Sequence, residues 1–417
     1  MSPFVVAALV ALNLAVIFLL LAAPLGVRTI EQRVRVAAPR ERLWSALWPL
    51  GENAGWSGQV LSSEAVAGSP DRARVRLSWE GRDGRPIEKL LRLSDVVESE
   101  RFAARVEDDS SLDPAFWSHY REETVLEDDG VETVVRLVRT DRYRGLAFVI
   151  FRYFAMRREL TRLKEWGERG TVSRRFLFER PLTQLGFALL SAFILWPFFG
   201  LTPGGFVLAS VLTMVVALHE LGHMAAFRLM GHRKVRMIFI PLLGGIAIGG
   251  RPYDSRFEVA FVALMGAGFS AFLVPIAIAS SDFAQLNDYP AAATVLAVLA
   301  GIAAFFNIAN LVPVWKFDGG QVLRQICPGP VVLAVASFAT LSAFLALGRL
   351  TGLSASLMVA MGAVFAVLSL MTTGSAVKPR HELKPIRTAE RVALAAAFAA
   401  VFAIHFCGVL WAYQRMA

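Results

Sequence analysis

Long apolar stretches, repeated along the chain, constrain this sequence more than any other feature. About 20 apolar residues are needed to cross the ~30 Å hydrocarbon core of a bilayer. On that criterion the sequence predicts about eight membrane spans, at residues 3–25, 182–199, 205–229, 257–280, 291–314, 331–347, 353–371 and 391–413. Hydrophobic residues make up 55% of the 417 positions and the mean hydropathy is +0.52. We therefore expect a polytopic α-helical membrane protein.

The charged residues are concentrated between Arg28 and Arg180, which indicates one soluble domain inserted into a membrane protein. The first apolar segment has no basic n-region and is longer than a usual h-region, which favours a retained anchor over a cleaved signal peptide. The predicted layout is an N-terminal membrane anchor at 1–26, a soluble domain at 27–170, a membrane core at 171–376, and a basic loop with a C-terminal transmembrane helix at 377–417.

A ninth apolar stretch, Met237–Gly250, is too short and too rich in glycine for a full span. Its sequence MIFIPLLGGIAIGG contains Pro241 and two glycine pairs. Irregular backbone at membrane depth is tolerated only where protein or water satisfies its polar groups. We therefore expect a re-entrant hairpin or strand that lines a cavity.

Basic residues predict the orientation. Eight Arg and Lys residues lie between Arg157 and Arg180, directly before the second span, which places this stretch in the cytoplasm by the positive-inside rule. Counting spans from there puts the other basic loops on the same side and the non-basic loop SSDFAQLNDYP outside. The net charge of +9 is explained by this topology, and no nucleic-acid partner is expected.

The soluble insert shows a different pattern. Val27–Val36 is predicted to be extended, Pro39–Trp48 to be a short helix, and Thr124–Val138 to contain a hairpin at Asp129-Gly130. A long amphipathic helix closes the insert, and further β-rich runs lie at Ala73–Trp79 and Ile87–Val97. This is the order of an α+β helix-grip fold. With VRVAAPRERLWSAL at its start and RRELTRLKEW at its end, the insert resembles START-like domains of the polyketide-cyclase type. The resemblance implies a cavity for a hydrophobic ligand, whereas the tryptophans alone are equally consistent with a filled core.

The third apolar span contains VVALHELGHMAAF, which places His219 and His223 four residues apart. On a helix this spacing puts both imidazoles on one face, where they can share a metal ion, with Glu220 beside them. Zinc suits two imidazoles and a carboxylate with one position left for water. Ionisable residues inside an apolar span indicate function, although hydrogen bonds between packed helices are the alternative explanation.

A third metal ligand is expected near the cytoplasmic ends of the spans. The fifth span runs FFNIANLVPVWKFDGGQ, where Asp318 follows an apolar helix interrupted at Pro313. Gly319 and Gly320 allow a tight backbone turn directly after it. In the predicted topology Asp318 and His223 lie at the same membrane level and can meet.

HELGH, followed about 95 residues later by Asn310-x-x-Pro313-x-x-x-x-Asp318-Gly319, resembles the site-2 protease family of intramembrane zinc metalloproteases. The resemblance implies that His219, His223 and Asp318 bind one zinc ion and that Glu220 is the general acid and base. It also implies that Asn310 helps to hold the substrate or the oxyanion, and that the stretch containing Gly244 and Gly245 pairs with an unwound substrate. The sequence departs from the family where many members have Ala-Gly-Pro-x-x-Asn, because it has Ala267-Gly268-Phe269-Ser270-Ala271-Phe272.

The other histidines, His119, His232, His381 and His405, have no ligand partner at a useful spacing and are interpreted as structural or solvated. The two cysteines, Cys327 and Cys407, lie far apart in apolar segments and predict neither a disulfide nor a zinc site.

The leading hypothesis is a zinc-dependent intramembrane endopeptidase that cleaves transmembrane segments of regulatory or remnant membrane proteins. It is expected in a bacterial inner membrane, with the active site towards the cytoplasm and regulation by the START-like domain. A non-proteolytic membrane scaffold is less favoured because Glu220 is intact, and a lipid-binding sensor anchored by its membrane part remains the third hypothesis.

Overall fold

The computed structural model divides the chain into two compact units. The sheet unit comprises Met1–Arg174 and Gly374–Glu382, and the helical unit comprises Arg175–Thr373 and Leu383–Ala417. Each is described by itself. The residues that the structure describes are 8, 11–12, 15, 18–20, 22–172, 181–240, 244–314, 317–356, 358–359, 361–362 and 380–416.

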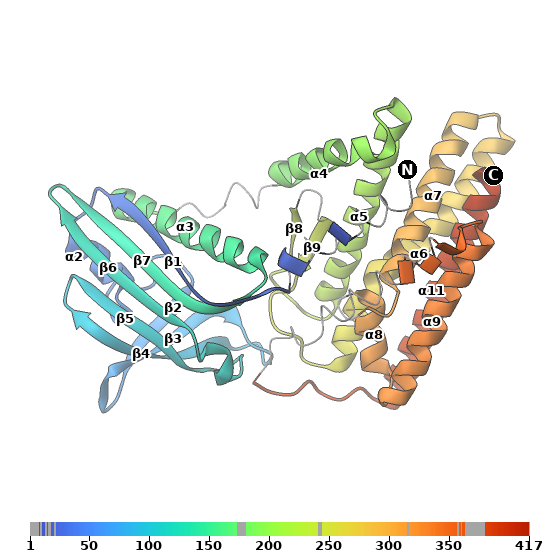
Figure 1. The fold of residues 1–417 in the computed structure, drawn as a ribbon. Coiled ribbons are helices and arrows are strands. Elements are labelled where there is room, and N and C mark those ends of the chain that lie inside the picture. The colour runs from blue at the N-terminus through green and yellow to red at the C-terminus, as the bar shows by residue number, and fades with distance from the viewer. Residues whose placement is uncertain are drawn as a thin grey trace. The chain divides into compact units, whose positions relative to one another are not determined.

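The sheet unit is built on one antiparallel sheet in the order β1-β7-β6-β5-β4-β3-β2 (Figure 1). From β2 to β7, neighbours in the chain are neighbours in the sheet, so these connections are hairpins or short excursions, whereas β1 and β2 lie at opposite edges and β1 pairs with β7. The turn between β6 and β7 begins after Asp129, and Gly130 adopts a left-handed conformation with φ of 75° that suits glycine. The strands are β1 (Pro24–Val36), β2 (Val60–Val66), β3 (Ser69–Glu80), β4 (Pro86–Val97), β5 (Arg101–Asp109), β6 (Arg121–Asp129) and β7 (Glu132–Arg144).

Two helices pack on this sheet. The short α2 (Arg40–Leu47) follows β1, and the long α3 (Leu146–Arg169) follows β7, with a 3₁₀ turn η1 (Pro114–Trp117) between β5 and β6. Buried Met156, Leu160 and Leu163 form the inner face of α3, and they pack on β1, β7 and Leu43 of α2. The predicted strands, short helix, hairpin and closing helix are confirmed, so the unit has the element order of a helix-grip fold.

Among its described residues, the helical unit has long or medium helices and one short helix that matters for the site. They are α4 (Pro181–Leu195), α5 (Pro203–Leu229), α6 (Arg256–Leu286), α7 (Pro290–Asn310), α8 (Asp318–Ile326), α9 (Pro330–Leu350) and α11 (Thr388–Met416). Five of them, α5, α6, α7, α9 and α11, are long and apolar enough to cross a membrane. Of these five, α6 is the most buried.

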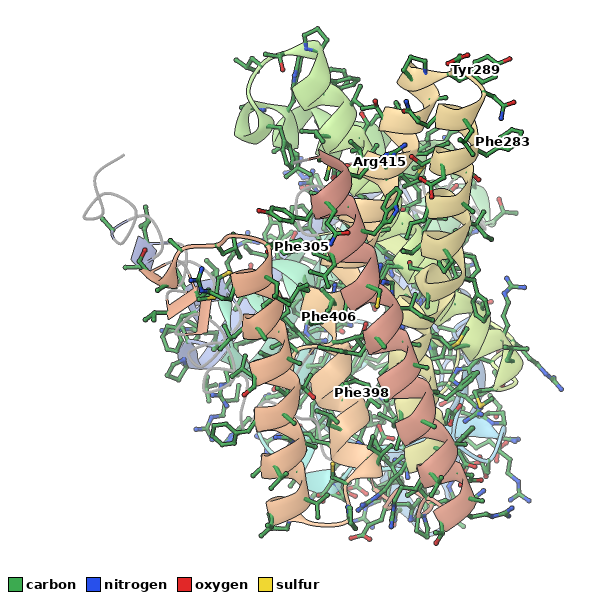
Figure 2. All side chains as sticks on the ribbon, turned by 90° about the vertical axis from the view of Figure 1, so that its right-hand side faces the viewer. Phe283, Tyr289, Phe305, Phe398, Phe406 and Arg415 are labelled. Carbon is green, nitrogen blue, oxygen red and sulfur yellow. The ribbon has the colours of Figure 1, made fainter. Side chains whose placement is uncertain are left out.

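These helices match five of the predicted spans. The stretch 182–199 differs, because α4 has 15 residues and gives way to a 3₁₀ turn, η3 (Trp196–Phe199), that contains Pro197. Proline lacks the amide that would continue the α-helix. Most of the predicted anchor at 3–25 and of the predicted span at 353–371 lies outside the described residues. Figure 2 shows Phe398 and Phe406 on α11, and exposed Phe283 and Tyr289 near the connection of α6 to α7.

The stretch 237–250 forms a two-stranded antiparallel hairpin of β8 (Arg236–Ile240) and β9 (Gly244–Ile248). The predicted strand conformation is thus confirmed, while Pro241 lies outside the described residues. The amide of Phe239 on β8 donates to Oε1 of Gln184 on α4 at 2.6 Å, whereas β9 lies against α5.

Helices α5 and α6 approach each other closely at Gly222. A Cβ atom at this position would lie 2.2 Å from the carbonyl oxygen of Met265. Backbone cannot yield as a flexible side chain can, so only glycine fits there without separating the helices.

We expect Gly222→Ala to lower the free energy of unfolding by about 1–3 kcal/mol, the usual cost of overpacking a core. Thermal unfolding of the detergent-purified, metal-free protein measures the effect. The matched control is Gly268→Ala on α6, whose Cβ would make only an ordinary contact of 3.4 Å with Met265 Sδ. Equal unfolding temperatures for the two variants would contradict the tight contact.

Candidate metal centre

His219 and His223 lie on successive turns of α5, and both rings point to the same side of the helix. Their ring centroids are 4.7 Å apart and their Nε2 atoms are 3.1 Å apart. His219 is buried and His223 is partly buried. The spacing of four residues therefore brings two nitrogen donors to one point, as the sequence predicted.

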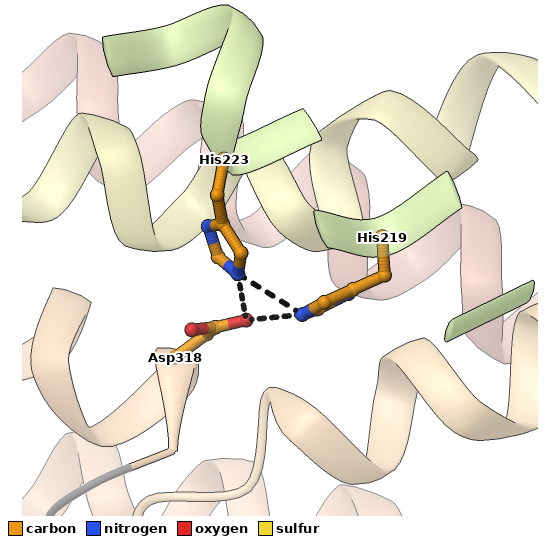
Figure 3. Close-up of side chains that lie close together, drawn as sticks. All are labelled: His219, His223 and Asp318. Atoms are coloured by element: carbon orange, nitrogen blue, oxygen red, sulfur yellow. Dashed lines mark hydrogen bonds and ion pairs between the residues drawn. The ribbon is translucent and has the colours of Figure 1, made fainter. Parts of the chain in front are cut away.

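Asp318 meets the two histidines from α8. Its Oδ2 atom lies 3.0 Å from Nε2 of His219 and 3.5 Å from Nε2 of His223 (Figure 3). The next residue is Gly319, where a Cβ atom would lie 1.9 Å from the carbonyl oxygen of Leu311. Glycine thus allows α8 to begin directly against the chain that leaves α7, and this places Asp318 at the site.

The other ring nitrogens are held by acceptors. Nδ1 of His223 lies 2.7 Å from the carbonyl oxygen of Val262 on α6. Nδ1 of His219 lies 2.8 Å from Oδ1 of Asn307, whose Nδ2 donates to the carbonyl of Ala303. Since both partners accept, the network assigns the proton of each neutral ring to Nδ1. Both Nε2 atoms then turn bare lone pairs towards Asp318.

This arrangement fits a cation. Oδ2 of Asp318 is buried and accepts no well-aligned hydrogen bond from any described residue. One proton could link two of the three atoms, but only a cation can satisfy all three at once. Ligands at the corners of a tetrahedron with metal bonds of about 2.0–2.1 Å lie about 3.3 Å apart. The separations of 3.0, 3.1 and 3.5 Å agree with that spacing.

A buried glycine on α6 makes room for the two rings. A Cβ atom at Gly266 would lie 2.6 Å from Cε1 of His219 and from Cε1 and Nε2 of His223. The edge of His219 also packs on Phe306, with centroids 5.3 Å apart. The imidazoles are therefore enclosed by α6 and α7 as well as hydrogen-bonded to them.

Glu220 lies beside the three ligands and is tied to the hairpin. Its Oε2 accepts a hydrogen bond of 2.9 Å from the amide of Ala247 on β9, and Oε1 makes no hydrogen bond to a described residue. A Cβ atom at Gly245 would lie 2.3 Å from Cγ of Glu220. Gly245 thus lets β9 pass close to the carboxylate, while Gly244 pairs with Ile240 of β8.

A second asparagine, which the sequence motif did not single out, supports His219. Asn310, which the motif singled out, ends α7 and donates from Nδ2 to the carbonyl of Phe306 at 3.0 Å. Asn307, one turn earlier, is fully buried and contacts His219. An asparagine inside an apolar span was the available signal for Asn307, because a buried amide needs partners.

The remaining histidines are not among the described residues that form the metal-ligand group. His232 is buried, and its Nε2 lies 2.6 Å from Oε1 of Glu258, which also pairs with Arg251 at 2.9 Å. It is therefore structural. His405 is buried with Nε2 3.0 Å from the carbonyl of Ala267, whereas His119 and His381 are exposed. Cys327 and Cys407 are free.

Comparisons with known proteins give likenesses in structure alone. The sequence matches no protein-family model and no curated protein. The Aha1 dimer structure from Colwellia psychrerythraea is 15% identical, with a TM-score of 0.28, covering 34% of this chain and 98% of its own. A START superfamily protein from Mycobacterium smegmatis is 12% identical, with a TM-score of 0.25, covering 32% of this chain and 92% of its own. START-like neighbours thus cover about a third of the chain.

We expect Asn307→Ala to weaken metal binding about 10- to 100-fold, the range for loss of a group that orients a ligand. Competition with a chromophoric zinc chelator measures the affinity. Asn310→Ala is the matched control, because its amide is bonded within α7. The assignment fails if Asn310→Ala weakens binding and Asn307→Ala does not.

Proposed function

We propose that this chain is a zinc-dependent intramembrane endopeptidase. The observation that carries the proposal is the convergence of His219, His223 and Asp318 beside Glu220, whose carboxylate is bonded to the edge of a β-hairpin. Metal ligands and a proton acceptor are the parts that metal-assisted peptide hydrolysis requires, and the strand edge beside them offers a place for an extended substrate.

The chain's residues have separate roles in this proposal. A bound zinc ion would supply Lewis acidity towards water and the scissile carbonyl. Glu220 takes the proton of the attacking water on Oε1 and passes it to the leaving amine, a step within the reach of a positioned carboxylate. The bond from Ala247 to Oε2 keeps the carboxylate oriented during both transfers. Asn307 and Val262 hold the imidazoles.

Strand β9 is proposed as the place where the substrate lies. The amide of Ala247 points away from β8, since it donates to Glu220, so this edge of β9 faces the metal ligands. A substrate segment unwound from its helix could add to the edge by main-chain hydrogen bonds. Gly244 and Gly245 carry no side chains that would block it. Asn310 is kept as a contributor to substrate or oxyanion binding.

The apolar helices set the class of substrate. Five helices of the same unit are long and apolar enough to cross a membrane, which supports substrates that are themselves membrane-embedded. We propose transmembrane segments of regulatory or remnant membrane proteins, cleaved in a bacterial inner membrane on the cytoplasmic side.

The test is cleavage of a panel of single-span substrates by detergent-purified protein, together with its metal content. The wild type should hold about one zinc per chain. Glu220→Gln should keep the zinc and lose cleavage by a factor of about 10² or more, because a general base typically contributes 10²–10⁴. Asp318→Asn should lose both.

The outcomes of this experiment distinguish the peptidase from the scaffold and from the sensor. If Glu220→Gln cleaves the substrates at the wild-type rate, Glu220 is not the general base. If the protein holds zinc but cleaves none of the substrates, the non-proteolytic membrane scaffold is favoured. If it holds no zinc, the lipid-binding sensor is favoured.

Topology is tested by cysteine labelling in cells that produce the chain with Cys327→Ala and Cys407→Ala. We expect Asp288→Cys, between α6 and α7, to react with an impermeant maleimide in intact cells. Arg233→Cys, after α5, should react only after permeabilisation, because basic loops stay in the cytoplasm. The reverse pattern would place the ligands at the outer face.

A further inference from the structure

The sheet unit contains a cavity between its sheet and α3. One lobe has a volume of about 530 Å³ and an adjoining lobe about 310 Å³, and five residues line both. Ligand pockets usually fall between about 300 and 1,000 Å³, so the space suits an organic molecule. The residues lining both lobes are Gln59, Leu77, Leu91, Glu122 and Glu159.

The wall nearest α3 is charged and internally satisfied. Oε2 of Glu122 accepts from the hydroxyl of Tyr120 at 2.7 Å and from Nε of Arg139 at 2.6 Å. Arg139 also pairs with Glu159 at 2.8 Å. Although burial opposes it, Arg139 holds the pKa of the Glu122 carboxyl below its ordinary value. These side chains satisfy one another's hydrogen bonds and charges. Their polarity nevertheless makes the cavity less apolar than the START-like resemblance implied.

Two donors in the larger lobe make no hydrogen bond to a described residue, although one of them forms a long ion pair. Nζ of Lys89 lies 4.2 Å from the ring centroid of Trp117 and 3.9 Å from Oδ2 of Asp109, too far for a hydrogen bond. Nε1 of Trp117 is buried and has no hydrogen-bond partner among the described residues. The Asp109 carboxylate meanwhile accepts from the amides of Ser111 and Leu112 through Oδ1.

An ammonium and an indole N–H can only donate, so the group that complements them is a hydrogen-bond acceptor, and the ammonium favours one that carries negative charge. Burial lowers the pKa of Lys89, and the nearby Asp109 opposes this shift without cancelling it. The same lobe has an apolar wall of Leu77, Trp79, Ile87 and Leu91. One side of the lobe therefore suits an acidic group and the other a hydrocarbon or aromatic body.

We propose that the cavity of the sheet unit binds an amphipathic organic acid, with its anionic group at Lys89 and Trp117 and its apolar body against Leu77 and Leu91. This site is separate from the metal centre, and it does not depend on the proposed peptidase activity.

The experiment is isothermal titration of the full chain in lipid nanodiscs with naphthalene-1-acetate, octanoate and decanoate. Empty nanodiscs correct for partition into lipid. Naphthalene-1-acetamide has the same ring system without the charge, and it should bind about 10- to 100-fold more weakly than the acid, the range for losing a hydrogen bond to a charged group.

Variants test the two anchors. Lys89→Met should weaken binding of the acid by the same factor and bring acid and amide to similar affinities. Trp117→Phe, which keeps a ring but removes the N–H, should weaken it less. Lys89→Arg retains the cation and should retain binding, so it distinguishes loss of charge from loss of fold. Lys164→Met removes an exposed cation of α3 that does not line the cavity and is the matched control.

Three results would overturn the proposal. They are equal affinity for acid and amide in the wild type, unchanged affinity in Lys89→Met, and no binding of any of the three acids. Because none of these readouts involves zinc or cleavage, failure here is distinguishable from failure of the peptidase proposal.

Discussion

Three lone pairs directed at one point, two from imidazoles and one from a carboxylate, are the constraint on which the helical unit depends. These lone pairs would repel one another in an apolar interior. The hydrogen bonds at Nδ1 of each ring hold the ring proton there and keep it away from Nε2. Four helices take part in this arrangement. Helix α5 carries the imidazoles, α6 and α7 orient them, and α8 supplies Asp318. A site with so many converging supports would be pre-organised for the proposed cation rather than assembled by it.

The sequence predicted the parts of this site that depend on local periodicity. His219, Glu220 and His223 share a helix, so their spacing alone determines that they lie together. Asp318 required a topological argument about span ends, and the structure brings it to the histidines. Asn307 could not be found in this way, because the rotation of α7 about its axis decides whether residue 307 or 310 faces His219. Hydropathy does not report that rotation.

Segment length and hydropathy were also insufficient to predict where the helix ends at one expected span. Residues 182–199 are apolar enough, but Pro197 ends the regular helix near its last turn. In the sheet unit, the alternation of apolar and polar residues predicted strands correctly, but it did not predict which face of the sheet α3 would cover. Lys89, Glu122 and Arg139 are polar strand positions of the kind that usually face water. Their enclosure under α3 is a property of the fold and gives the cavity its charge.

Helix α8 is only nine residues long, and a helix of this length does not persist alone in water. Val322, Leu323 and Ile326 tether it to α6, and Asp318 is its first residue. An ion shared by Asp318 and the histidines would therefore join the order of α8 to that of α5. Bound at a free concentration 100 times its dissociation constant, such an ion adds about 2.7 kcal/mol to the folded state. Loss of such an ion would remove this link between α5 and α8 and leave α8 held by its packing on the neighbouring helices.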